Sequence, residues 1–316
     1  MSDLLVFNKL TDHMRVRIED VFAPTYFQTI DATEWLPLHG DTIRFILTDG
    51  PTGVPSEVLK QLPNAEIISN VGVGYDGVDT VITTERGIPV CHTPDVLNEE
   101  VATTALMLYL ACWRNLEAEM ALARSGRWGS EGNLPLPRTP ENRRVGILGL
   151  GRIGKAVVRK LAPWTTDIVY FGRSKQDIPF PYYSDLIAMA RDCETLVCIA
   201  PGGDATRNLI SREVMDAIGP DGFLINVGRG STVDEMALIG ALQEGTLGGA
   251  GLDVYVDEPH IPSALRSLPN TVLLPHIGSA SIETRRAMAD LAIDNLIAWK
   301  EGRPLLSPVP ESASLL

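Results

Sequence analysis

Six short apolar segments separated by helix-length gaps follow residue 143, and this alternation constrains the fold more than any other feature of the sequence. The segments are near-continuously apolar, which is typical of strands that helices cover on both faces. Strands that alternate with helical stretches predict a parallel, doubly wound sheet with right-handed crossovers. The six segments are RVGILGL (144–150), DIVYFG (167–172), TLVCIA (195–200), GFLINVG (222–228), GAGLDVY (249–255) and TVLLPHIG (271–278).

The first of these segments ends in a glycine-rich turn. VGILGLGRIGKAVVRKL (145–161) has Gly149, Gly151 and Gly154 in the GxGxxG spacing, after a predicted strand and at the start of a predicted helix. In a dinucleotide site these glycines allow a tight turn, close approach of the backbone to the pyrophosphate, and close packing of helix on strand. The helix start also favours phosphate through its amides and dipole. The spacing alone is weak, but together with its strand–helix–strand context it predicts a dinucleotide-binding (Rossmann) domain.

A smaller α/β unit precedes this domain, with the apolar segments LLVF, IRFILTDG, AEIISNVGVGYD and IPVCHTP. A length of 316 residues also favours two domains. Asn98 can cap a long apolar helix whose first turn is acidic, so we place the crossover near 95–99. The last clear helix, within 281–302, is expected to pack back on the first domain. We therefore expect a substrate-binding domain at 1–97 and 286–316, and the dinucleotide-binding domain at 98–285.

Composition excludes several classes of function. A net charge of -13 argues against wide nucleic-acid or anionic-membrane surfaces, which recruit basic patches. The main apolar run, at 101–113, is too short to span a bilayer, and the first residues lack a signal-peptide pattern. The four cysteines show no metal-type CxxC pairing. We expect a cytoplasmic protein with reduced thiols and no metal, nucleic acid or membrane partner.

A basic turn stands where a site for NAD usually has an acidic residue, about twenty positions after the glycines. The segment YFGRSK provides Gly172, Arg173, Ser174 and Lys175, and the nearest acid, Asp167, lies at the other end of the strand. Guanidinium, hydroxyl and ammonium groups suit a ribose 2′-phosphate. The alternative is a solvated basic turn on an acidic protein. We expect a preference for NADPH over NADH.

Three late strands end in polar residues, and the carboxyl ends of parallel strands share one edge of a sheet. Arg229 follows the first of these strands, Asp253 and then Glu258 follow the second, and His276 stands at the end of the third. Reduction of a 2-oxo acid leaves an alkoxide that needs a proton, and His276 is the expected general acid. Glu258 would favour its imidazolium form and orient the ring. Arg229 would hold the substrate carboxylate and polarise the carbonyl.

Each of these residues has a structural alternative. Asp253 suits the nicotinamide carboxamide, whereas Asn226 is expected to be structural. The alternative for His276, which follows Pro275, is that it merely caps a strand. The alternative for Arg229 is that it merely pairs with a surface acid. Joint placement after strands of one sheet favours the chemical interpretation, because His276 alone among five histidines follows a late strand.

At these residues the sequence resembles the D-isomer-specific 2-hydroxyacid dehydrogenase family over nearly its whole length. The matching motifs, in order, are SNVGVGYDGVD, GILGLGRIG, LINVGRG, GAGLDVY, DEP and PHIGS. Within the family, YFGRSK, LGGAGLDV and LLPHIGSASIETR most resemble NADPH-dependent glyoxylate, hydroxypyruvate and hydroxyphenylpyruvate reductases. The resemblance implies a Rossmann nucleotide domain and a flavodoxin-like substrate domain flanking a cleft. It also implies the catalytic trio Arg229, Glu258 and His276, and a homodimer whose arm near Trp128 wraps its partner.

The resemblance further implies the ligand contacts. The substrate carboxylate is expected to bind the backbone of Val71, Gly72, Val73 and Gly74, with Arg229 and His276. A plain strand-ending turn is the alternative for these glycines. A departure from the family pattern at Gly202–Asp204 makes contacts near that loop less secure. The implied cofactor contacts are Gly149, Leu150, Gly151, Arg152, Ile153, Gly154, Gly172, Arg173, Ser174, Lys175, Ala200, Pro201, Thr206, Val227, Gly228, Asp253, Gly278 and Ser279.

The leading expectation is an NADPH-dependent reductase of small 2-oxo acids such as glyoxylate and hydroxypyruvate. Two alternatives remain. The enzyme could reduce a bulkier acid of the phenylpyruvate type or 2-ketogluconate. From another class, the chain could be a non-catalytic NAD(P)-sensing protein, since fold alone does not determine function.

Overall fold

The computed structural model describes residues 2–316, which form two compact units. One comprises the residues up to Leu97 together with 281–316, and the other comprises 98–280. The return to the first unit lies at 280/281, five residues before the expected 285/286. The reason is α13 (Ile282–Lys300): Ser281 caps it by accepting the N–H of Thr284, and the whole hydrogen-bonded helix belongs to the first unit.

The first unit contains a five-stranded sheet in the order β2-β1-β3-β4-β5, with every pair parallel. This is the flavodoxin-like order, so the expected fold class of this unit is confirmed. The edge strand β2 was not predicted, because its Pro-Thr-Tyr sequence has no apolar run. The strands are β1 (Leu4–Val6), β2 (Pro24–Tyr26), β3 (Phe45–Asp49), β4 (Ile67–Val71) and β5 (Val90–Cys91).

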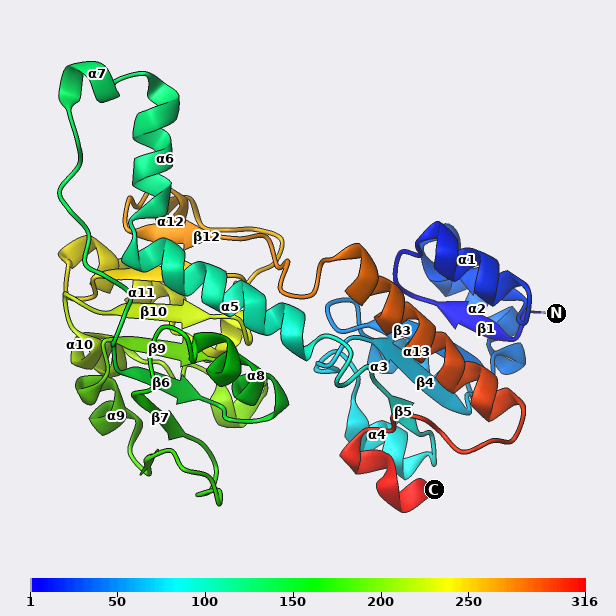
Figure 1. The fold of residues 1–316 in the computed structure, drawn as a ribbon. Helices are drawn as coiled ribbons and strands as arrows, with labels where there is room; N and C mark the ends of the chain where they lie inside the picture. Colours follow the sequence, from blue (N-terminus) through cyan, green and yellow to red (C-terminus); the bar gives the residue numbers. More distant parts are fainter. Residues whose placement is uncertain (1) are drawn as a thin grey trace. The chain divides into compact units, whose positions relative to one another are not determined.

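Alternation along these strands produces two cores, one on each face of the sheet. Leu4 and Val6 pack with α1 and α13, whereas Leu5 between them packs with α2 and α3. Figure 1 shows α13 crossing the sheet beside β4, as expected for a helix that returns to this unit. The remaining helices and 3-10 turns are α1 (Asp12–Glu19), η1 (Phe27–Thr29), α2 (Ala32–His39), η2 (Gly40–Thr42), α3 (Ser56–Leu59), α4 (Thr80–Glu85) and η5 (Pro310–Leu315).

The second unit contains a seven-stranded parallel sheet in the order β12-β11-β10-β9-β6-β7-β8. The first strand, β6, lies between β7 and β9, so the chain reverses its direction of travel across the sheet there. Ligands of doubly wound sheets bind outside the carboxyl ends of strands at this switch point. The strands are β6 (Val145–Leu148), β7 (Ile168–Phe171), β8 (Tyr182–Tyr183), β9 (Thr195–Cys198), β10 (Phe223–Asn226), β11 (Gly249–Leu252) and β12 (Thr271–Leu273).

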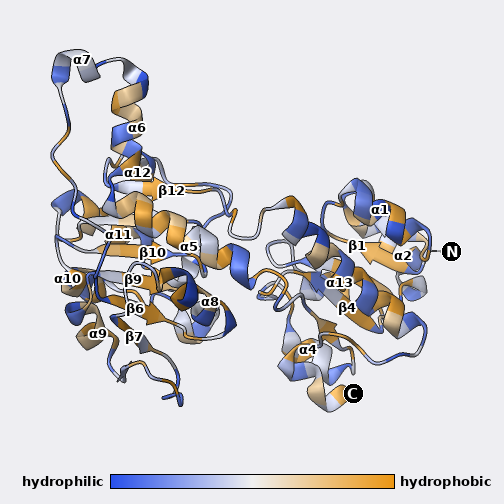
Figure 2. Cartoon of the chain, viewed as in Figure 1, coloured by the Kyte–Doolittle hydropathy of each residue, from blue (hydrophilic) through white to orange (hydrophobic). Residues whose placement is uncertain are grey.

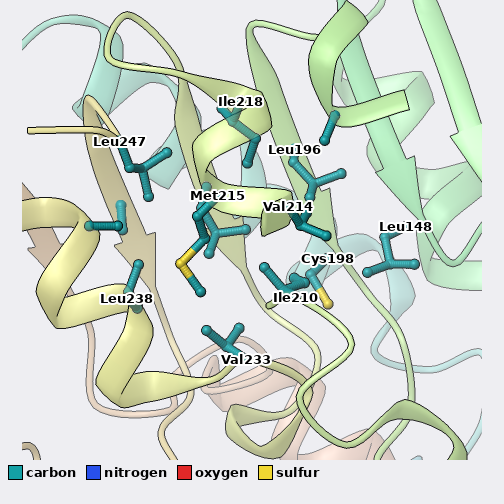
Figure 3. Close-up of a cluster of buried hydrophobic side chains, with 14 of the residues drawn as sticks. Leu148, Leu196, Cys198, Ile210, Val214, Met215, Ile218, Val233, Leu238 and Leu247 are labelled. Carbon is teal, nitrogen blue, oxygen red and sulfur yellow. The ribbon is translucent and has the colours of Figure 1, made fainter. Parts of the chain in front are cut away.

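Helices cover both faces of this sheet. On one face, α10 and α11 bring Val214, Met215 and Leu238 onto Leu196 and its neighbours, as Figure 3 shows. On the other face, α5 lies close to β11, since a side chain at Gly251 would meet Leu108 at 3.0 Å. The elements are α5 (Asn98–Trp113), α8 (Arg152–Leu161), α9 (Leu186–Asp192), η3 (Asp204–Thr206), α10 (Arg212–Ile218), η4 (Gly230–Thr232), α11 (Glu235–Glu244) and α12 (Ser263–Arg266).

A projecting hairpin precedes β6 in the second unit (Figure 1). It consists of α6 (Leu116–Ser125), α7 (Trp128–Glu131) and an extended return to β6. The sequence predicted an irregular arm at 124–143, and the structure adds the short helix α7 within it. Figure 2 shows apolar positions along this hairpin, and Trp128 and Leu136 are 61% and 92% exposed. These side chains have little contact with their own unit.

The cysteines are free and buried, as predicted for reduced core thiols. Burial raises the pKa of Cys91 and, against a lowering effect of Arg144, that of Cys193, each to about 12. Such thiols are inert as nucleophiles near neutral pH. Within residues 2–316, none of the helices combines the length and the apolar character that crossing a membrane requires.

Candidate active site

The glycine-rich turn joins β6 to α8, and its three glycines have different surroundings. Gly149 has φ +98°, and a side chain there would lie 3.0 Å from the carbonyl of Ile199. A side chain at Gly154 would lie 2.4 Å from the carbonyl of Gly149, so Gly154 lets α8 pack on the turn. Gly151 has no protein atom within 4 Å of its missing Cβ, so its backbone faces open space. This arrangement fits a bound pyrophosphate at the start of α8.

The basic turn follows β7 as predicted. Arg173, Ser174 and Lys175 are exposed, and a side chain at Gly172 would also meet open space. Asp167 at the opposite end of β7 pairs with Arg144, 3.0 Å between Nε and Oδ2, which removes it from the edge that carries the glycines. The edge near the glycine turn therefore offers cations and no carboxylate from β7.

The turn after β10 carries Arg229, and hydrogen bonds of Asn226 to its backbone hold its shape. Asn226 accepts the N–H of Gly228 at 3.0 Å and donates to the carbonyl of Arg229 at 3.0 Å. Asn226 is thus structural, as predicted. A side chain at Gly230 would lie 1.9 Å from the backbone carbon of Tyr255, so the turn packs directly on the segment that leads to Glu258.

Glu258 and His276 form a hydrogen-bonded pair. The Nδ1 of His276 lies 2.5 Å from Oε2 of Glu258, and Oε1 of Glu258 accepts the N–H of Tyr255 at 3.0 Å. Because the carboxylate accepts, Nδ1 carries the proton and Nε2 is the nitrogen left for other partners. No group within residues 2–316 bonds Nε2, and the His276 side chain is 35% exposed. The pair is therefore oriented and open to a ligand.

The backbone at His276 is strained and is held by Asp253. His276 has φ +55°, which is uncommon for residues other than glycine and is found at functional sites. The buried Asp253 accepts hydrogen bonds from the backbone N–H groups of the two residues that follow His276, Ile277 at 2.7 Å and Gly278 at 2.8 Å. Asp253 thus positions the loop that carries the histidine. Its contact with a cofactor carboxamide stays a prediction.

The charge of Glu258 is stabilised in place. Burial by itself raises the pKa of this carboxyl, but the bonds from His276 and the Tyr255 N–H, with the charges of His276 and Arg229, outweigh burial. The pKa of Glu258 therefore lies below its ordinary value of 4.5. Half of the Glu258 carboxyl groups would be protonated only at a pH below 4.5, so the carboxylate is ionised at neutral pH.

In the first unit, the turn after β4 carries the predicted substrate-binding residues. Asn70 donates to the carbonyls of Gly72 and Gly74, at 3.1 and 3.0 Å, and His92 Nδ1 donates to that of Val73 at 2.9 Å. The N–H groups of Val73 and Gly74 have no acceptor among the described residues. A turn whose carbonyls are occupied and whose amides are open favours an anion.

The other predicted cofactor residues lie after strands of the second unit, at the same edge. Ala200 and Pro201 follow β9, and Thr206 donates to the carbonyl of Pro201 at 2.7 Å. Val227 and Gly228 follow β10, whereas Gly278 and Ser279 follow β12. Topology places these residues together, and their contacts with a cofactor stay predictions. Leu150, Arg152 and Ile153 complete the glycine turn.

Several positioning residues were not identified in the sequence. The hydroxyl of the buried Tyr255 donates to the carbonyl of Leu274 at 2.9 Å, two residues before the histidine. Burial raises the pKa of this phenol far above its ordinary value, so it remains a donor. An aromatic residue three positions after β11 was a usable signal, whereas nothing in the sequence indicated the bonds of Asn70 and His92 to the anion-binding turn.

Comparison with known proteins decides the family. Residues 106–278 match the family described as D-isomer specific 2-hydroxyacid dehydrogenase, NAD binding domain. The chain belongs to the D-isomer specific 2-hydroxyacid dehydrogenases. Two curated relatives are each 44% identical over 87% of this chain and 88% of their own: glyoxylate/hydroxypyruvate reductase A of Arabidopsis thaliana and hydroxyphenylpyruvate reductase of Plectranthus scutellarioides.

A solved structure is also similar to this dehydrogenase over its whole length. It is the NADPH-dependent glyoxylate/hydroxypyruvate reductase of Sinorhizobium meliloti, in complex with NADP and malonate. The TM-score is 0.93 with 43% identity, covering 98% of this chain and 97% of that one. The expected fold of two parallel-sheet α/β domains is thereby confirmed.

Proposed function

We propose that this dehydrogenase reduces small 2-oxo acids, glyoxylate and hydroxypyruvate foremost, to D-2-hydroxy acids with NADPH. The observation that carries the proposal is the His276–Glu258 pair, whose open Nε2 stands at the strand edge that also carries the glycine turn. The bound cofactor supplies a hydride to the carbonyl carbon. The Nε2–H of His276 donates the proton that the developing alkoxide needs, and Glu258 stabilises the imidazolium. Arg229 polarises the carbonyl through its guanidinium.

Open amides support the site for the substrate carboxylate. The N–H groups of Val73 and Gly74 provide two donors without an acceptor, and malonate in the Sinorhizobium meliloti enzyme shows that a relative accepts a small carboxylate. We assign the first unit as the substrate-binding domain and the second as the dinucleotide-binding domain on these grounds.

Steady-state assays with a panel of 2-oxo acids and both cofactors test this function. Turnover of glyoxylate with NADPH is the expected result. Preference for phenylpyruvate-type acids or 2-ketogluconate would instead indicate the bulkier class, which the 44% identity to a hydroxyphenylpyruvate reductase favours as the second candidate. Binding of NADPH without turnover of any acid would contradict the enzymatic proposal and indicate a sensor.

The preference for NADPH is argued from the exposed basic turn. Replacement of Arg173 by alanine should raise the KM for NADPH about tenfold or more, because a charge-assisted bond to phosphate contributes about 1.5–3 kcal/mol. The KM for NADH should change little, since NADH lacks that phosphate. Arg191→Ala, which removes an exposed arginine from the end of α9, is the matched control. Equal effects of Arg173→Ala on both cofactors would contradict the preference.

We also propose a cytoplasmic homodimer that forms through the second unit. The hairpin of α6 and α7 supports it, because Trp128 and Leu136 are large apolar side chains left exposed on a projecting segment. A partner copy that covers them would remove this apolar area from water.

A further inference from the structure

We propose that Tyr170 and Gln176 are positioning residues for cofactor choice, which hold the turn 172–176 in the shape that receives a ribose 2′-phosphate. The inference rests on the proposed use of NADPH. It concerns groups that do not themselves carry the charge: a buried phenol and an amide, next to the cations that would touch the phosphate.

The cations of this turn have no support of their own. Arg173 and Lys175 are exposed, and within residues 2–316 neither side chain has an ion-pair or hydrogen-bond partner. Residues 172–176 also lie outside any helix or strand, so no backbone ladder fixes them. Binding a phosphate on such a turn costs conformational entropy unless something else orders its backbone.

Two tyrosine hydroxyls supply that order at the ends of the turn. The fully buried Tyr170 in β7 accepts the N–H of Gln176 at 2.7 Å. Tyr182 in β8 donates to the carbonyl of Gly172 at 3.3 Å, and its ring lies against that of Tyr170, 5.3 Å between centroids. Hydrogen bonds therefore hold the turn at Gly172, directly after β7, and again at Gln176, four residues later.

The side chain of Gln176 makes the third connection. Its Nε2 donates to the carbonyl of Leu150 at 2.9 Å, in the middle of the glycine turn. This bond joins the turn proposed for the 2′-phosphate to the turn proposed for the pyrophosphate. It fixes their separation before the cofactor arrives. NADPH and NADH differ only in the 2′-phosphate. Both would contact the glycine turn, but that turn is also held between β6 and α8, so loss of these bonds should disturb mainly the basic turn and weaken the binding of NADPH more than that of NADH.

The test compares Tyr170→Phe and Gln176→Ala with the wild type, using NADPH and NADH in parallel. Gln176→Ala removes one hydrogen bond, whereas Tyr170→Phe removes the 2.7 Å bond and a longer one of 3.4 Å that the phenol donates to the carbonyl of Gln176. We expect the KM for NADPH to rise about five- to tenfold in each variant. The KM for NADH and both kcat values should stay within about twofold. Tyr183→Phe is the matched control, because Tyr183 lies in the neighbouring strand β8 and its hydroxyl bonds Asp192 at 2.7 Å and not the turn.

Each outcome decides the inference. A KM increase that is equal for NADPH and NADH would mean that these residues only stabilise the fold, and would overturn it. Gln176→Ala keeps the test valid if Tyr170→Phe fails to fold, because Gln176 is only half-buried. If Arg173→Ala discriminates between the cofactors and neither new variant does, this inference fails and the proposed NADPH preference stands. If Arg173→Ala does not discriminate either, the preference itself fails.

Discussion

Replacement of His276 by alanine is expected to lower the kcat for glyoxylate reduction about a hundredfold or more, the usual scale for loss of a general acid. The variant keeps Glu258 and Arg229, but no group remains to protonate the alkoxide. Glu258 is not placed to replace the histidine, because its carboxylate bonds Nδ1, on the side of the ring away from the Nε2 that faces a ligand. Steady-state kinetics near pH 7 measure the loss, with NADPH binding followed by fluorescence titration.

The control for this experiment is a second histidine in the same unit. His260 is 81% exposed by its side chain and lies 3.9 Å from Asp257, outside the pair of Glu258 and His276. His260→Ala should leave kcat unchanged. NADPH binding by His276→Ala should also be unchanged, since the ring holds no part of the glycine turn. Full activity of His276→Ala would remove the proton donor from the proposed reaction.

Replacement of Arg229 by alanine is the second large effect. We expect kcat/KM for the 2-oxo acid to fall about 10²- to 10³-fold, the scale for losing a donor that stabilises charge in the transition state. Both KM and kcat should change, because the guanidinium is proposed to bind the carboxylate and to polarise the carbonyl. The variant loses the bond that the guanidinium donates to the carbonyl of Gly228 at 2.8 Å, but Asn226 and Gly230 should still hold the backbone of the turn.

A conservative variant separates charge from geometry. Arg229→Lys keeps the charge but loses the planar fork, so it should recover only part of the lost kcat/KM. Full recovery would indicate that a point charge suffices. NADPH affinity should be the same in the wild type and both variants. If Arg229→Ala weakens cofactor binding and leaves the KM for the acid unchanged, the assignment to substrate is wrong.

Local chemistry explains what could be predicted from the sequence. The apolar segments of the second sheet became β6, β7, β9, β10, β11 and β12, because a strand covered on both faces needs a continuous apolar run. Gly149, Gly151 and Gly154 were informative because backbone turns and close approaches restrict residue choice. The two short edge strands β2 and β8 were not predicted, since edge strands can lack that apolar signal.

Contacts between residues that are far apart in the chain could not be predicted from the sequence. Ile282 in the first turn of α13 is 85% exposed, whereas Met288 and Leu296 further along the helix are buried. The boundary at Ser281 has the same origin, since the packing of the whole helix decides where a unit begins. A periodic pattern shows which face of a helix is apolar, but not how far along the helix its partner extends.

The sequence by itself therefore determined the two doubly wound units, the glycine turn, and the residue types that stand at the strand ends. Only the tertiary structure decided how those groups are held. Three examples join residues at least 18 positions apart in the sequence. They are the 2.5 Å hydrogen bond between His276 and Glu258, the bonds that Asp253 accepts from the backbone after His276, and the bond of Gln176 to Leu150. Such contacts depend on which strands are neighbours in the sheet, and strand order is a property of the folded chain, whereas propensity and glycine spacing act within a few residues.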